Sequence, residues 1–200
     1  MINNQKTKLS KKLFISEIKD SHDRLREFKR LLNRERSKLN VLYKKYCFID
    51  EIVNPKVDDI ELELFILDLF KNLGLICKRP RKKADFDLTV EYNSQIVGIE
   101  VKNDRHVKEN ELFQAKKYAG RYQMENNKIL HPLVIWNNTK ANICFDINRI
   151  NDALANNYGI MTTTELLKGY LLIKSNKMSF GMFYEKILRT GLIKFSNYKI

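Results

Sequence analysis

The 200 residues are 44% apolar with 7 Gly and 3 Pro, which suits one domain of about 150 residues plus an accessory element and argues against disorder as the main state. The three cysteines, Cys47, Cys77 and Cys144, are widely spaced, which excludes a disulfide framework and a cysteine zinc site and suits a reducing cytoplasm. No apolar stretch approaches the ~20 residues that span a membrane, and the N-terminus lacks a secretory signal, so we expect no membrane partner.

The net charge of +13, with a pI near 9.6, favours polyanionic partners. Residues 1–50 carry 14 Lys+Arg and 6 Asp+Glu, a balance of +8, and the remaining 150 residues carry 23 and 18, a balance of +5. By charge alone, nucleic acid is the first candidate and an anionic membrane surface the second, and we expect DNA to be the partner.

The first predicted element is helical. Residues 9–48 contain no Gly or Pro, and apolar side chains recur there at alternating intervals of four and three residues, interrupted at Ser21 and Glu35. This heptad pattern predicts one long helix or a helical hairpin. The apolar positions are Phe14, Ile18, Leu25, Phe28, Leu32, Leu39, Leu42 and Tyr46.

An apolar seam of this kind is expected to pack either on the body of the same chain or on a partner helix. We expect a homodimer or a larger assembly through this helix, whose other face can touch phosphate. The basic residues of that face are Arg24, Arg26, Lys29, Arg30, Arg34, Arg36 and Lys38. The chain therefore divides into a basic helical element, residues 1–53, and a domain, residues 54–200.

Beyond that element, helices and strands alternate. Asn54 and Pro55 end the first helix, Asp58 can cap a second helix over residues 60–72, and Gly74 ends it. Strands are then expected at residues 75–77, 86–92, 95–102, 130–136 and 159–161, with helices at 109–126, 147–155, 165–173 and within 179–195, before a terminal extended segment. This order, with a turn at Asn93-Ser94, predicts an α/β fold with a mixed sheet flanked by helices.

Three residues carry the chemistry. Asp87 lies at the start of one predicted strand, and Glu100 and Lys102 leave the same face near the end of the next strand. A hairpin can bring the two carboxylates together, and a hard divalent cation such as Mg²⁺ relieves their repulsion. Lys102 can then position the attacking hydroxide, so these parts suffice for hydrolysis of a phosphodiester. Asp85 has the same strand parity and is an alternative to Asp87.

Asp87-Leu88-Thr89-Val90 followed by Ile99-Glu100-Val101-Lys102 resembles the PD-(D/E)xK, or restriction-endonuclease-like, nuclease superfamily. Glu63, at its distance from Gly74, is similar to a helical glutamate of the Mrr-like and Holliday-junction-resolvase-like branch, with Glu61 as the alternative. Gln114 and Tyr118 match the Gln-x-x-x-Tyr motif of the same branch. Residues 133–138 and 159–167 are similar to the distal half of uncharacterised nucleases from bacterial defence loci.

The resemblance implies a restriction-endonuclease-like core that hydrolyses DNA with Mg²⁺, for which Mn²⁺ can substitute. Asp87, Glu100 and Glu63 would hold the metal, and Gln114 and Tyr118 would orient the site or touch the substrate backbone. RNA is not excluded as a substrate. The residues expected to contact phosphate are Arg79, Arg81, Lys82 and Lys83 in a basic loop, and Lys117 and Arg121 on the following helix.

Two other functions fit the sequence. The chain can be a non-catalytic nucleic-acid-binding or scaffolding subunit that retains the fold, although a complete Asp/Glu/Lys set argues against this. It can also be an oligomerising coiled-coil adaptor whose main surface is the apolar seam.

Overall fold

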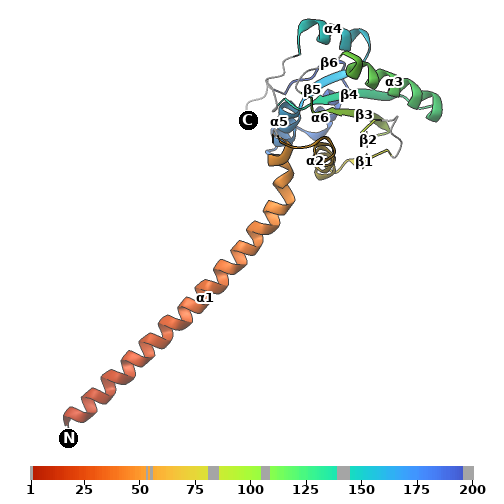
Figure 1. Ribbon diagram of the computed structural model, residues 1–200. Helices are drawn as coiled ribbons and strands as arrows, with labels where there is room; N and C mark the ends of the chain where they lie inside the picture. Colours follow the sequence, from red (N-terminus) through yellow and green to blue (C-terminus); the bar gives the residue numbers. More distant parts are fainter. Residues whose placement is uncertain are drawn as a thin grey trace. The chain divides into compact units, whose positions relative to one another are not determined.

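The computed structural model describes all residues except 1, 53, 55, 81–85, 105–108, 139–144 and 196–200, and it describes no side chains for residues 2–17, 43–48 and 109–112. The chain forms two compact units, residues 1–47 and residues 48–200. Figure 1 shows the helices and strands along the chain. No helix among the described residues combines the length and apolar character needed to cross a membrane.

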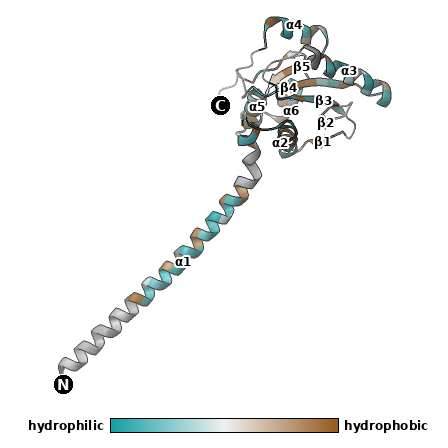
Figure 2. Ribbon diagram, viewed as in Figure 1, coloured by the Kyte–Doolittle hydropathy of each residue, from teal (hydrophilic) through white to brown (hydrophobic). Residues whose placement is uncertain are grey.

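One continuous helix, α1, spans Ile2–Ile52, so the long-helix alternative is correct and the hairpin alternative is wrong. The apolar seam is exposed throughout its described part, with Ile18 at 44% and Leu39 at 67% exposure. Figure 2 shows hydrophobic residues recurring along α1 between hydrophilic ones. Packing of this seam on the body of the chain and pairing with a partner helix both remain predictions.

The second unit is built on a six-stranded mixed sheet with the strand order β1-β2-β3-β4-β5-β6. β1, β2 and β3 are antiparallel, whereas β3, β4, β5 and β6 are parallel. The strands are β1 (Ile76–Lys78), β2 (Leu88–Tyr92), β3 (Gln95–Lys102), β4 (Leu130–Trp136), β5 (Gly159–Thr162) and β6 (Gly191–Leu192). The expected mixed α/β sheet is confirmed.

Two layers of helices cover the sheet. α3 (Glu109–Asn126) and α4 (Ile147–Ala155) pack on one face, and α2 (Asp59–Asn72), α5 (Thr163–Lys174) and α6 (Phe180–Ile187) pack on the other. β3 and β4 are buried on both faces over most of their length, which fits the apolar residues Ile96, Val97, Ile99 and Val101 of β3 and residues 133–136 of β4. Trp136, Tyr158 and Ile160 lie in the core under α3 and α4.

Local sequence signals explain most element boundaries. Asp58 caps α2 in a capping box with Glu61, and Thr162 caps α5. Asn93 and Ser94 both have positive φ, as the two central residues of a tight β2–β3 hairpin require. Several predicted boundaries differ from the structure by one or two residues. β1 is shifted by one residue, β2 begins at Leu88 instead of residue 86, and α5 begins at Thr163 instead of residue 165.

Candidate active site

Glu100 and Lys102 lie at the end of β3, the third strand of the sheet. The alternation of a strand sends both side chains to the face that α3 covers, while Ile99 and Val101 point to the opposite face. The Lys102 ammonium donates to Glu100 Oε1 at 2.7 Å, and only 6% of the Glu100 side chain is exposed. A charged pair is therefore buried at this end of the strand.

Asp87 directly precedes β2 and lies beside Glu100. The antiparallel register pairs Leu88 with Ile99, so the next residues outward are Asp87 and Glu100. The main-chain N–H of Val101 donates to Asp87 Oδ2 at 2.8 Å. The expected meeting of these two carboxylates across the hairpin is therefore present. The alternative residue Asp85 lies outside the described residues.

Glu63 reaches this region from α2. Its Oε2 accepts a hydrogen bond from Arg79 at 2.5 Å, and the negative charge of Asp87 helps to raise its pKa after the larger effect of burial. Glu61, the alternative on the same helix, is exposed and completes the capping box with Asp58. The structure therefore brings Glu63, not Glu61, to Asp87 and Glu100.

The helix α3 contributes Gln114 and Tyr118 from the covering side. Gln114 Oε1 accepts from the Lys102 ammonium at 3.1 Å. The Tyr118 ring packs edge-on against Phe86 with 5.7 Å between ring centroids, and the charge of Glu100 adds to burial in raising the pKa of its phenol. We call Glu63, Arg79, Asp87, Glu100, Lys102 and Gln114 the charged cluster.

Excess negative charge characterises the charged cluster. Burial raises the pKa of Glu100 to about 7, and the neighbouring Asp87 charge adds to this effect although Lys102 opposes it. The pKa of Asp87 is also raised, first by burial, even though the Val101 N–H and the Lys102 charge lower it. The protein's own cations thus compensate the carboxylates only in part.

The donor set fits a hard divalent cation. Glu100 Oε2 is buried and has no hydrogen-bond partner among the described residues, although buried carboxylate oxygens are normally satisfied. Asp87 and Glu100 offer oxygen ligands, which such cations prefer. The described residues contain no group of three His, Cys, Asp or Glu side chains that could hold a metal ion together. Glu63 and Glu100 each place one carboxylate oxygen next to a basic residue. Asp87 and Glu100 are therefore the ligands that the geometry offers first.

A hydrogen-bonded network of asparagines and threonines, next to the charged cluster at the ends of β3 and β4, was not predicted. Asn103 follows Lys102 and donates to the carbonyl of Val57 at 2.8 Å, while its Oδ1 accepts from Asn137 at 2.7 Å. The main-chain N–H of Asn137 donates to the carbonyl of Lys102, and Thr163 at the start of α5 donates to Asn138. We call these residues the asparagine network. It joins the end of β3 to the segment before α2 and to α5.

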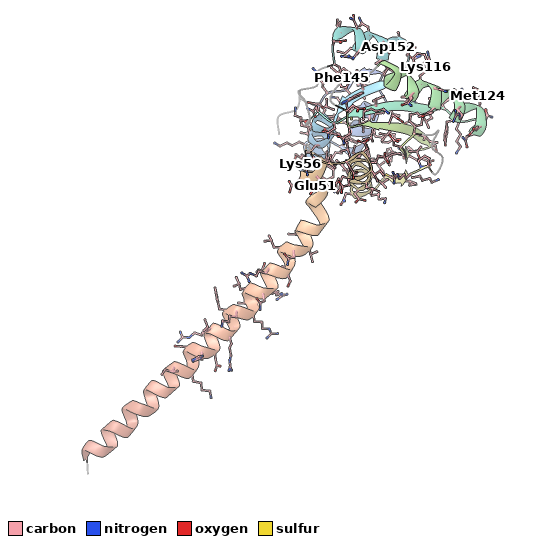
Figure 3. The ribbon with its side chains drawn as sticks, in the orientation of Figure 1. Glu51, Lys56, Lys116, Met124, Phe145 and Asp152 are labelled. Atoms are coloured by element: carbon pink, nitrogen blue, oxygen red, sulfur yellow. The ribbon has the colours of Figure 1, made fainter. Side chains whose placement is uncertain are left out.

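The residues expected to contact phosphate have different surroundings in the structure. Arg79 binds Glu63 with its guanidinium, Lys117 is exposed on α3, and Arg121 stacks near the Tyr118 ring at 5.9 Å. Figure 3 shows side chains on the same helix, with Lys116 and Met124 labelled. Three further expected residues, Arg81, Lys82 and Lys83, lie outside the described residues.

No family model matches this sequence, and no curated protein matches it significantly. Solved structures do match in fold. The restriction endonuclease FokI aligns with a TM-score of 0.57 and 16% identity over 74% of this chain, which corresponds to 30% of FokI. FokI bound to DNA aligns with a TM-score of 0.55 and 16% identity, over 76% of this chain and 31% of that one.

The small subunit of the heterodimeric restriction endonuclease R.BspD6I aligns with a TM-score of 0.51 and 16% identity, over 72% of this chain and 86% of that subunit. The chain thus spans under a third of FokI and most of the R.BspD6I subunit. The fold is that of restriction endonucleases. This finding confirms the expected restriction-endonuclease-like core.

Proposed function

We propose that this protein is a metal-dependent nuclease that hydrolyses phosphodiester bonds in DNA. One observation carries the proposal: a buried Asp87–Glu100–Lys102 group at the end of a central strand, with the carboxylate oxygen Glu100 Oε2 buried without a hydrogen-bond partner among the described residues. Restriction-endonuclease folds in the comparisons, one of them bound to DNA, support the same substrate. Glu63, Gln114 and Tyr118 support a placement in the Mrr-like branch.

In this proposal, Asp87 and Glu100 hold Mg²⁺ or Mn²⁺, and Glu63 assists directly or through water. The cation, when bound, polarises the phosphoryl oxygen and neutralises charge that develops during attack. Lys102 lies between Glu100 and Gln114, which fixes its ammonium where it can orient the attacking water. Gln114 holds Lys102 in place, and Tyr118 closes the α3 side of the site.

Substrate affinity in this proposal comes from phosphate contacts of basic residues around the cluster. Lys117 and Arg121 on α3 can contact one stretch of backbone, and Arg79, Arg81, Lys82 and Lys83 can contact another. Such contacts do not depend on sequence, and their strength falls as the salt concentration rises.

Assembly through α1 is a further part of the proposal. In this proposal the chain divides into a helical element, residues 1–53, and a nuclease domain, residues 54–200, and the apolar seam belongs to the helical element. One structural neighbour is a subunit of a heterodimeric restriction endonuclease, which supports assembly as a requirement for activity. We place the protein in the cytoplasm and in bacterial defence or DNA processing.

The deciding experiment is cleavage of plasmid and linear DNA, and of RNA, with Mg²⁺ or Mn²⁺. We expect cleavage by the wild type and a loss of at least about a hundredfold in Lys102→Ala, because a charge aimed at the reacting group is removed. Lys71→Ala, an exposed lysine on α2, is the matched control and should cleave normally.

Two results would decide against this function. If neither protein cleaves any DNA or RNA and no divalent metal binds, the enzyme proposal is wrong. Tight DNA binding without cleavage and without metal binding would instead support a non-catalytic subunit that retains the fold.

A further inference from the structure

Among the described residues, the apolar seam of α1 is a row of exposed apolar side chains along one helix. Within the described part of the helix, the side chains at seam positions are between 44% and 67% exposed. These positions are Ile18, Leu25, Phe28, Leu32, Leu39 and Leu42. A seam with this spacing over more than three heptads is the contact surface of a coiled coil.

The positions that flank the seam select among partners, because in a coiled coil they face the flanks of the other helix. Between residues 18 and 42 these flanks carry no acidic side chain. They are occupied by His22, Arg24, Lys29, Leu31, Arg36 and Lys38. The acidic residues of this stretch, apart from Glu35, lie on the outer side of the helix at Asp20, Asp23 and Glu27.

A second copy of α1 fits this surface poorly. In a parallel pair, Arg24 of one copy would face Lys29 of the other, and the two Glu35 carboxylates would meet in the seam itself. An antiparallel pair would place basic flanks opposite basic flanks. Like charges opposite one another destabilise such pairs.

We propose that the seam binds an amphipathic helix of a different protein, whose flanks are acidic and whose residue opposite Glu35 is basic or a neutral amide. The apolar side chains of the seam would be buried against such a helix. Arg24, Lys29 and Arg36 would face the carboxylates on its flanks. The phosphates of a nucleic acid could pair with the basic flanks, but the apolar seam would stay exposed to water. The inference rests on the assembly part of the proposed function and is independent of the nuclease part.

A charge-reversed copy of the chain supplies a defined acidic partner. The variant Arg24→Glu, Lys29→Glu, Glu35→Lys, Arg36→Glu keeps the seam leucines and presents acidic flanks. By sedimentation at micromolar concentration, we expect the wild type alone and the variant alone to be monomers. An equimolar mixture of the two full chains should sediment at twice the mass, and added salt should dissociate it.

A matched control has the same change in net charge on the outer side of the helix. Arg26→Glu, Arg30→Glu should remain monomeric when mixed with the wild type, because neither residue flanks the seam. Leu25→Ala, Leu32→Ala in both chains should abolish the mixed complex, which would show that the seam holds it together. Circular dichroism checks that each variant keeps the helix.

Three results would overturn the inference. A wild-type dimer as stable as the mixed complex would identify a second copy as the partner. Failure of the mixture to associate, with the helix intact, would show that flank charge does not define the partner. A larger loss of duplex DNA binding in the flank variant than in the control, with no mixed complex, would assign the face to nucleic acid. None of these outcomes depends on whether the protein cleaves DNA.

Discussion

The charged cluster buries charged side chains, whereas the apolar seam exposes apolar ones. At the end of β3 the residue Glu100 is only 4% exposed, whereas in α1 the residue Phe28 is 64% exposed. Burial of a charge costs free energy unless the charge is paired, and exposure of an apolar group forfeits the gain of burying it. Both regions therefore hold free energy that a bound molecule can recover.

The two regions differ in how much of the interaction the chain supplies itself. Asp87, Glu100 and Lys102 are already fixed by the Val101 N–H, by one another and by Gln114. The described side chains of the seam have no such partners, because no described apolar residue of α1 before Ile52 is buried. Side chains that are already held in place suit catalysis on a small reacting group, whereas an exposed apolar seam suits the binding of another helix.

The largest expected effect comes from a leucine-to-alanine substitution made once in the core of the sheet and once in the apolar seam. Leu133→Ala in β4, where the side chain is fully buried, should lower the free energy of unfolding by about 2–5 kcal/mol because it leaves a cavity. Leu39→Ala in α1 should change it by no more than about 0.5 kcal/mol. Urea unfolding at low micromolar concentration measures both. Equal costs would mean that the seam is already buried in the free protein.

The second prediction concerns pH. The pKa of Glu100 rises from 4.5 to about 7 in the folded protein, so the folded state holds a proton that the unfolded state releases between those values. Stability from this group is therefore full below about pH 4.5 and falls as the pH rises to 7, by on the order of 2–3 kcal/mol. Unfolding experiments across pH 4.5–8 in the presence of a chelator measure this loss.

Glu100→Gln serves as the reference for that measurement. The amide keeps an acceptor for Lys102 and does not ionise, so the variant should lose less stability than the wild type as the pH rises. Addition of Mg²⁺ at pH 8 should stabilise the wild type more than the variant, since a ligand that binds the folded state stabilises it. Identical pH profiles for the two proteins would contradict the raised pKa.

Local patterns made much of the fold and part of the cluster predictable. The hairpin followed from Asn93 and Ser94, and the capping of α2 followed from Asp58, because turns and caps depend on adjacent residues. Strand alternation placed Glu100 and Lys102 on one face, and helical spacing placed Gln114 near them. Each of these features lies within one element or between two neighbouring elements.

Features that depend on distant parts of the chain were not predictable. The ion pair of Arg79 with Glu63, which lies sixteen residues away in the sequence, was not predicted. The bond from Asn103 to the carbonyl of Val57 joins residues 46 positions apart, and single asparagines outside a repeating pattern leave no signal in the sequence. The surface that the seam contacts was not predictable either, because a heptad pattern predicts a helical contact without identifying the partner.

The third prediction tests how firmly the asparagine network fixes the charged cluster. Asn103→Ala should lower the free energy of unfolding by about 1–3 kcal/mol, because it removes two buried hydrogen bonds, one to the carbonyl of Val57 and one from the side-chain amide of Asn137. Asn126→Ala removes the same type of bond, from a side-chain amide to a main-chain carbonyl, at the surface of α3. Its effect should stay within about 0.5 kcal/mol.

Equal small effects of the two asparagine substitutions would show that the network does not hold the end of β3. The proposed nuclease activity gives a second measurement of the same point. Displacement of Lys102 by loss of Asn103 should lower the maximal cleavage rate more than it weakens DNA binding, because Lys117 and Arg121, which are proposed to bind phosphate, lie on α3.

The smallest expected effect comes from a glycine-to-alanine substitution at an open position, which we compare with the same substitution at a tightly packed position. A Cβ at Gly120 on α3 meets no atom within 4 Å, so Gly120→Ala should raise the free energy of unfolding by up to about 1 kcal/mol through helix propensity. A Cβ at Gly98, two residues before Glu100, would approach the Phe86 ring to 2.5 Å and Leu130 to 2.6 Å. Gly98→Ala should therefore destabilise the protein and displace Phe86 from Tyr118, which thermal unfolding and tyrosine fluorescence can follow. A stabilising Gly98→Ala would show that the sheet and α3 can separate at low cost, and the charged cluster would then be less rigid than its hydrogen bonds indicate.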